Sequence, residues 1–301
     1  MAILTTQQIS KYFDDYGKTE VTFNKQVIDA TGLVPNNISL KVADQQWPCI
    51  VYSSSMVGAR VICGVKASFF EQLRQSGSHA SLRYCFRLTD KPDPVPFFVP
   101  VKVLGYTQYN PKNPDVQLVT VEFTQRPPDD LIQILGRLLE AYANAQRRKE
   151  ERIVLTPESI KKLGLEPKEF LVFVENVPRK CIVRDLSFGG AKVLVSGIAK
   201  FLENRKASLK LIRSDASEEI LVPGVIARVE NVEGRKDIVA LALKFDENLP
   251  VTYNLMINAY LTSTRRGAEL VSEPAPRPAR PKPASPPAGE GQSPSGTPST
   301  T

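Results

Sequence analysis

The feature that most constrains the fold of this chain is an internal repeat. When the sequence is shifted by 132 residues, residues 28–61 align without a gap with residues 160–193, and 12 of the 34 aligned positions are identical. A later block, Val99–Leu104 with residues 222–227, matches at a shorter offset, which predicts extra loop residues in the first copy around 75–96. Because a duplicated sequence folds as duplicated structural units, we expect two domains of one plan.

Each copy alternates short β-branched runs with turns rich in Gly, Pro, Asn and Asp. In the first copy the runs are Ile38–Val42, Cys49–Tyr52, Arg60–Cys63, Ala80–Leu88, Val99–Leu104 and Val116–Phe123. This pattern is typical of antiparallel strands in a small barrel or sandwich. Helical spacing follows the last run of each copy, over 128–147 in the first and from Pro250 to about Arg265-Arg266 in the second. We therefore expect a mainly β protein of two tandem small antiparallel β-barrels, each followed by a C-terminal helix.

The repeat also sets the expected domain boundaries, with a first domain over 1–145, a second over 146–268 and a tail over 269–301. An amphipathic helix containing Ile9 and Tyr12 opens the first domain. Residues 273–301 hold 9 of the 24 prolines, and such a composition buries too little apolar surface to fold. We expect a disordered, solvated tail; docking of the tail into a partner's aromatic groove is the alternative.

The composition argues against several function classes. The chain has one histidine, His79, and four scattered cysteines, which disfavours a zinc or iron site and a Ser-His-Asp or Cys-His catalytic group. We therefore expect no metal and no enzyme. No segment has the ~18–20 apolar residues of a membrane span, and the first 30 residues lack an apolar signal core, which predicts a cytoplasmic protein. The net charge of +7 suggests an anionic partner.

Two polar clusters stand out in the second copy. The first is Gln-Arg-Arg-Lys-Glu-Glu-Arg over 146–152, and the second is Arg-Asp-Leu-Ser-Phe-Gly-Gly over 184–190. Taken alone, the first cluster also fits a solvated helix end, where cations are stabilised by the helix dipole. The second alone also fits a simple turn, because Asp, Ser and Gly favour turns.

Together, the two clusters resemble the two-part signature of PilZ domains. Arg148 and Arg152 form Arg-x-x-x-Arg, and Asp185, Ser187 and Gly190 form Asp-x-Ser-x-x-Gly. The runs at 222–228 and 238–245 are also similar to later strands of that family, so the resemblance covers about 146–265. It implies a six-stranded antiparallel barrel with a C-terminal helix, and as usual ligand cyclic di-GMP, a bacterial second messenger.

The residue types suit that ligand. The planar fork of arginine matches phosphate and guanine O6/N7, and it stacks on flat rings. Asp185 can accept hydrogen bonds from guanine N1 and N2, and we expect Ser187 to point to the same side of an extended strand. Glycines remove side chains where the backbone turns or approaches the ligand. The predicted ligand residues are Arg147, Arg148, Arg152, Asp185, Ser187, Gly189 and Gly190.

The first copy supplies an internal control. Its positions equivalent to Arg148, Arg152 and Asp185 are Tyr16, Glu20 and Ser53, whereas Ser187 and Gly190 are matched by Ser55 and Gly58. The first copy thus resembles a degenerate PilZ-like barrel, and we expect that it does not bind the nucleotide.

Our leading hypothesis is a non-enzymatic receptor in which cyclic di-GMP, bound at the junction of the copies, changes the arrangement of the two barrels. The altered surface would engage or release a protein partner, and the resemblance implies the motility or envelope machinery. Two alternatives remain open. One is an adaptor or structural protein that binds only protein, with an idle signature. The other is a single-stranded nucleic-acid binder, for which the sequence shows no aromatic platform.

Overall fold

The computed structural model describes residues 5–88, 91–197, 202–214 and 219–272. Residues 273–301, the larger part of the predicted Pro-rich tail, lie outside the described residues. The structure divides by contacts into a unit of Met1–Ser263 and a remainder from Thr264 on. Both predicted barrels belong to the first unit.

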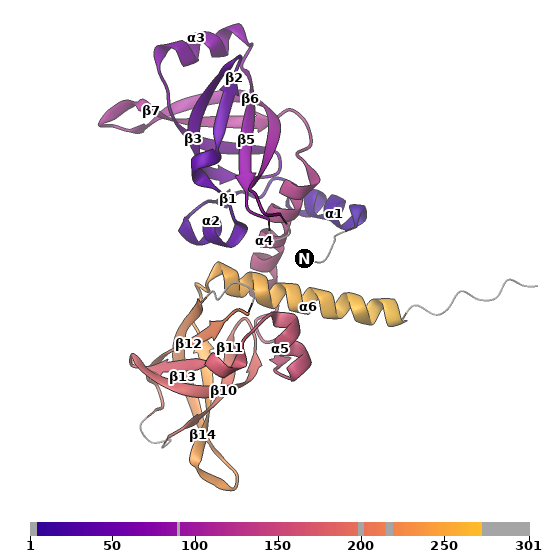
Figure 1. Ribbon diagram of the computed structural model, residues 1–301, viewed down its shortest axis with the longest axis vertical. Helices are drawn as coiled ribbons and strands as arrows, with labels where there is room; N and C mark the ends of the chain where they lie inside the picture. The colour runs from indigo at the N-terminus through magenta and orange to yellow at the C-terminus, as the bar shows by residue number, and fades with distance from the viewer. Residues whose placement is uncertain (1–4, 89–90, 198–201, 215–218, 273–301) are drawn as a thin grey trace, which may run out of the picture. The chain divides into compact units, whose positions relative to one another are not determined.

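The first barrel is a closed antiparallel sheet (Figure 1). Its strands neighbour one another in the order β3-β2-β5-β6-β7-β4, and the β3–β4 pairing closes the ring. A short strand, β1 (Val21–Thr22), pairs with β3. The bounds are β2 (Ser39–Val42), β3 (Gln45–Ser54), β4 (Gly58–Gly64), β5 (His79–Phe86), β6 (Val95–Asn110) and β7 (Asn113–Phe123).

The second barrel repeats this topology. Its strands run in the order β10-β9-β12-β13-β14-β11, the β10–β11 pairing closes the ring, and β8 (Ile153–Val154) pairs with β10. The tandem barrels predicted from the repeat are confirmed. The bounds are β9 (Leu171–Val174), β10 (Val177–Leu186), β11 (Gly190–Ser196), β12 (Lys206–Ile212), β13 (Glu219–Val232) and β14 (Arg235–Phe245).

Strict alternation along the strands separates the core from the outer wall. On β11, Ala191, Val193 and Val195 are buried inside the barrel, whereas the residues between them point outward. The four cysteines are free thiols and all are buried. Burial raises the pKa of the Cys181 thiol to about 12, so that it stays protonated.

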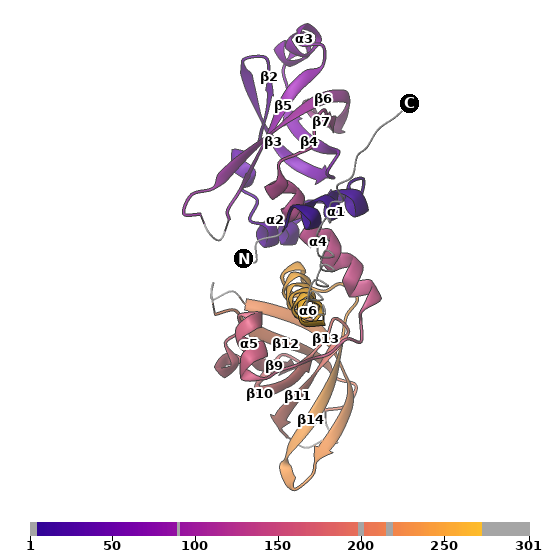
Figure 2. The same cartoon turned by 90° about the vertical axis from the view of Figure 1, so that its right-hand side faces the viewer.

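Three helices confirm the helical patterns of the sequence: α1 (Thr6–Tyr16), α4 (Asp129–Arg147) and α6 (Val251–Ser272). Figures 1 and 2 show α6 across one end of the second barrel, where its Tyr253 and Ile257 are fully buried in the core. The helix does not fade near Arg265-Arg266 and passes residue 268, where the second domain was predicted to end. Ala268, Glu269 and Leu270 are good helix formers, which favours this continuation.

Two short helices were not predicted, although the repeat carries their signals. They are α2 (Lys25–Thr31) and α5 (Pro157–Leu163), each followed by a single 3-10 turn, η1 (Pro35–Asn37) or η2 (Pro167–Glu169). Asn24 and Thr156 cap the two helices at the N-terminus, and Gly32 and Gly164 end them in the left-handed conformation.

Part of the extra length of the first copy lies earlier than the predicted 75–96. Leu40 pairs with Leu82, and its counterpart Val172 pairs with Leu209, so the offset has already fallen from 132 to 127 at that strand. The segment between β4 and β5 therefore holds five extra residues. It contains α3 (Ala67–Gln75), whose buried Phe69 packs edge-on against Trp47 with ring centroids 5.4 Å apart.

A buried hydrogen bond ties α6 to the end of β10. The Tyr253 hydroxyl donates to the Ser187 carbonyl oxygen over 2.8 Å, and its ring packs edge-on against Phe245. Burial, with a smaller contribution from the charge of Asp185, raises the pKa of Tyr253 well above its ordinary value. The hydroxyl therefore stays protonated and able to donate.

We predict that Tyr253→Phe lowers the free energy of unfolding of the second barrel by about 1–2 kcal/mol, because the buried Ser187 carbonyl loses its donor. Urea unfolding followed by circular dichroism measures the change. Tyr106→Phe is the control, since Tyr106 is 49% exposed. Equal unfolding midpoints for the wild type and Tyr253→Phe would show that this bond does not stabilise the barrel.

Candidate ligand site on the second barrel

The predicted arginine segment links a helix to a barrel wall. We name residues 147–152 the strap. α4 ends at Arg147, and the Arg148 N–H caps it by donating to the Asn144 carbonyl oxygen over 2.8 Å. After the strap, Ile153 and Val154 form β8, which pairs with Leu186 and Asp185 of β10. Both ends of the strap are thus fixed by backbone hydrogen bonds.

The middle of the strap rests on the turn between β10 and β11. The Gly189 N–H donates to the Lys149 carbonyl oxygen over 2.9 Å, and a Cβ at residue 189 would lie only 2.9 Å from that oxygen. Any side chain at this position would push the strap away. The equivalent residue of the first copy is Val57, and there the carbonyl of Gly17, the counterpart of Lys149, accepts instead from the Met56 N–H over 3.0 Å.

Ser187 and Gly190 lie inside this turn. The Ser187 hydroxyl, in a residue 1% exposed, donates to the Gly190 carbonyl and accepts from the Gly190 N–H, each over 3.1 Å. The expectation that Ser187 points to the same side as Asp185 is wrong, because β10 ends at Leu186 and strand alternation stops there. A Cβ at Gly190 would collide with the Leu243 carbonyl oxygen. Both residues shape the turn.

Asp185 lies on the outer wall, where the strap returns to it. The Arg152 Nη1 lies 2.6 Å from Asp185 Oδ1, and the two side chains are 47% and 17% exposed. The structure therefore brings together Arg152, Asp185 and Gly189. Arg147 and Arg148 stand at the end of α4, and neither guanidinium has a hydrogen bond or ion pair to another side chain in the part of the chain that the structure describes.

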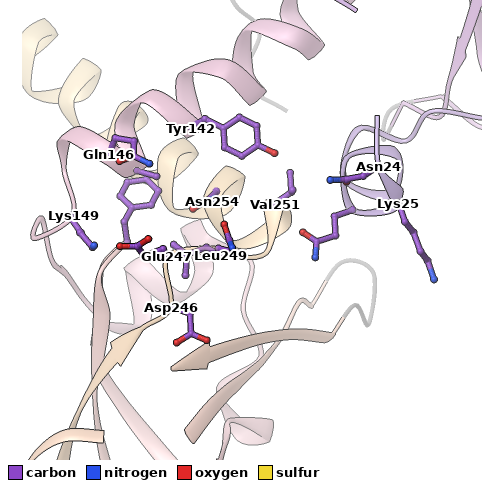
Figure 3. A pocket seen from close by; sticks show the side chains of 14 residues that line it. Asn24, Lys25, Tyr142, Gln146, Lys149, Asp246, Glu247, Leu249, Val251 and Asn254 are labelled. Atoms are coloured by element: carbon purple, nitrogen blue, oxygen red, sulfur yellow. The ribbon is translucent and has the colours of Figure 1, made fainter. Parts of the chain in front are cut away.

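A cavity of about 810 Å³ adjoins the strap. Gln146 and Lys149 line it, together with Phe188 of the turn and Asp246 and Asn254 near the start of α6. Figure 3 shows Gln146, Lys149, Asp246 and Asn254 around it. Its lining is mostly polar, and the Asn254 Oδ1 is buried without a hydrogen-bond partner among the described residues. Space for a polar ligand thus exists next to the strap.

In the first barrel, the position equivalent to Arg152 is occupied by a carboxylate, Glu20. Arg60 holds Glu20 in a bidentate pair, with Nε–Oε1 and Nη2–Oε2 distances of 2.8 Å, and the Ser53 hydroxyl also donates to Glu20. Burial alone would raise the pKa of Glu20, but the hydrogen bonds from Arg60 and Ser53 outweigh it and lower the pKa. An anionic ligand would have to displace this internal anion.

Two neighbours of the site were missed in the sequence. Tyr253 supports the turn from α6, and no motif marks it. Lys192 pairs directly with Asp185 across β10 and β11. Its signal was available, because the repeat places the cation Arg60 at the same position of the first copy.

Two classes of feature are lacking in the described residues. No helix there is long and apolar enough to cross a membrane. Nor do three or more His, Cys, Asp or Glu side chains gather there as they do around a metal ion.

The geometry defines a class of protein: two closed antiparallel β-barrels in tandem, the second of which carries a cationic strap beside the acidic Asp185. Comparisons with known proteins specify the class. A PilZN3 domain matches residues 7–142 and a PilZ domain matches residues 146–263. A protein of Treponema denticola named cyclic di-GMP binding protein is 42% identical over 269 residues, which cover 89% of this chain and 86% of that protein. The chain belongs to the PilZ family, whose members are receptors, and the expectation that it is not an enzyme is confirmed by that membership.

Solved structures resemble the chain more distantly. The PlzA protein of Borreliella burgdorferi in complex with c-di-GMP is 24% identical with a TM-score of 0.39, over 85% of this chain and 99% of that chain. YcgR of Escherichia coli in complex with c-di-GMP is 11% identical with a TM-score of 0.28, over 90% and 98%. Because both TM-scores are low, the fold rests on the strand pairings described above.

The internal ion pair of the first barrel is open to a direct test. We predict that the Glu20 carboxyl titrates below its ordinary pKa and that Arg60→Met moves the pKa upward, because the lowering depends on the hydrogen bonds from Arg60 and Ser53. The stabilisation from this pair is present above the ordinary carboxyl pKa and is lost as the pH falls through the lowered value. NMR titration of the carboxyl carbon measures both values; an unchanged pKa in Arg60→Met would contradict the assignment.

Proposed function

We propose that this protein is a cyclic di-GMP receptor that binds its ligand between the strap and the outer wall of the second barrel. The observation that carries the proposal is the docking of the strap on the turn, which sets Arg152 beside Asp185 and leaves Arg148 open. The relative named cyclic di-GMP binding protein, which matches most of the chain, supports the same ligand. The proposed binding residues are Arg147, Arg148, Arg152, Asp185, Ser187, Gly189 and Gly190.

Binding exchanges one set of charge contacts for another. In the structure Asp185 and Arg152 neutralise each other. A ligand phosphate takes over Arg152 as a bidentate partner, and the carboxylate is then free to accept from guanine N1 and N2. Arg148 meets the second phosphate or stacks on a guanine face. An exposed ion pair contributes only about 0–1 kcal/mol, so breaking it costs little.

Ser187 and Gly190 act in this site by shaping the turn. Their hydrogen bonds fix the turn, and the turn fixes Gly189, on which the strap rests. The first barrel keeps the same serine–glycine bonds at Ser55 and Gly58. These two residues therefore position the ligand residues in the second barrel.

The strap can transmit binding because it continues α4. The Asn144 side chain of α4 donates to Asn258 of α6 over 2.6 Å, and Asn258 donates to Glu140 over 3.0 Å. A ligand that orders the strap shifts the population of arrangements available to these helices. We propose that this shift changes how the two barrels, divided as 1–145 and 146–268, engage a protein partner in the cytoplasm, in the motility or envelope machinery.

A second candidate is an adaptor with an idle signature. The observation that favours it is that Arg152 and Asp185 already satisfy each other, so the site is stable without a ligand. The two candidates differ in one measurable property, which is saturable binding of the nucleotide.

Calorimetric titration with cyclic di-GMP separates them. We predict saturable binding to the wild type, and a loss of affinity of about tenfold to a hundredfold in Arg148→Met, Arg152→Met or Asp185→Ala, because each removes a charge-assisted hydrogen bond worth about 1.5–3 kcal/mol. Arg60→Met is the matched control, since it removes the cation of the closed first barrel. Cyclic di-AMP, which lacks the guanine N2 donor, should bind far more weakly. No binding by the wild type would favour the adaptor.

The strap contact gives an independent test. Gly189→Val installs the residue of the first copy and drives a side chain against the Lys149 carbonyl. We predict a loss of cyclic di-GMP affinity of at least about tenfold with little change in melting temperature, because the strap is displaced while the barrel core is untouched. Val57→Gly in the first barrel is the control. Unchanged affinity in Gly189→Val would show that the strap position does not matter for binding.

A further inference from the structure

Lys192 is a cation that faces Asp185 from the neighbouring strand, β11. The two residues are direct partners across the β10–β11 pairing, and side chains at such positions stand about 4.5–5.5 Å apart at Cβ on one face of the sheet. Ala191 and Val193 on either side are buried in the core, so Lys192 points outward. Its side chain is 39% exposed and therefore accessible to a ligand.

The first barrel shows how far a side chain at this position reaches. Arg60, the equivalent of Lys192, donates to Glu20 over 2.8 Å and to the Ser53 hydroxyl over 3.0 Å. Glu20 is the equivalent of Arg152, and Ser53 is the equivalent of Asp185. A long cationic side chain at this position of the strand therefore reaches the segment that precedes the barrel. In the first barrel the cation, Arg60, binds the Glu20 carboxylate there.

Lys192 is held at present by a partner that can release it. Its Nζ lies 2.9 Å from Glu230 Oε2, and Arg228 Nη2 lies 2.7 Å from Glu230 Oε1. The ion pairs lower the pKa of Glu230, chiefly through the hydrogen bond from Lys192 and then through the charge of Arg228. If Lys192 turns toward the strap, Arg228 still neutralises the carboxylate.

The ligand itself offers room for this lysine. Cyclic di-GMP carries two phosphates, whose oxygens can accept from a donor on the wall as well as from the strap arginines Arg147, Arg148 and Arg152. We propose that Lys192 is a further ligand-binding residue, which leaves Glu230 and donates to a phosphate oxygen of the bound cyclic dinucleotide. This inference rests on the proposed function and extends its site from the strap and β10 to β11.

The test is calorimetric titration of the full chain with cyclic di-GMP. Lys192→Met keeps the length of the side chain and removes its charge, and we expect a loss of affinity of about tenfold, as for one charge-assisted hydrogen bond. Lys192→Arg keeps the charge and should stay within about threefold of the wild type. Arg228→Met, which breaks the other ion pair of Glu230, is the matched control and should bind as the wild type does.

The outcomes separate this inference from the proposed function. If the wild type binds and Asp185→Ala does not, but Lys192→Met binds within twofold of the wild type, the role of Lys192 is overturned and the receptor stands. A loss in Arg228→Met as large as in Lys192→Met would assign the effect to the Glu230 ion pairs and also overturn it. If the wild type shows no saturable binding, both the receptor and the role of Lys192 fail. Melting temperatures of all variants, expected within a few degrees of the wild type, exclude unfolding as the cause of a loss.

Discussion

The central constraint on the site is the backbone hydrogen bond from the Gly189 N–H to the Lys149 carbonyl oxygen. It holds the middle of the strap against the turn, and the pairing of β8 with β10 holds its end. With both points fixed, the strap holds Arg152 within reach of Asp185, and the two side chains pair over 2.6 Å. Only glycine permits this approach, because a Cβ at residue 189 would lie within 2.9 Å of the carbonyl oxygen.

The two barrels show what happens when the same scaffold exchanges its charges. In the second barrel the strap carries a cation, Arg152, and the outer wall carries an acid, Asp185. In the first barrel the segment that precedes the barrel carries the acid Glu20, and the outer wall carries the cation Arg60. Each barrel is electrically satisfied on its own. The strap of the second copy also carries Arg147, Arg148 and Lys149, whereas the matching residues of the first copy are Asp15, Tyr16 and Gly17.

Under the proposed function, this arrangement lets the site be stable when empty and still accept a ligand. The internal pair of Arg152 and Asp185 prevents either charge from being stranded in a partly buried place, which would be costly. When a ligand binds as proposed, its charge-assisted contacts replace the pair, so that neither charge is left without a partner. The hydrogen bond from Asn144 of α4 to Asn258 of α6 then connects the strap to the rest of the chain.

The sequence by itself determined the architecture, because the repeat, the strand alternation and the helical spacing are all local patterns that the fold obeys. It also brought forward Arg152 and Asp185, since their motifs lie in order along the chain. Only the tertiary structure decided what each residue does. Ser187 faces inward because β10 ends one residue before it, and Lys192 belongs beside Asp185 because strand pairing joins residues that no motif connects. The ends of strands and the pairings between them are set by the closed barrel, which no local pattern can report.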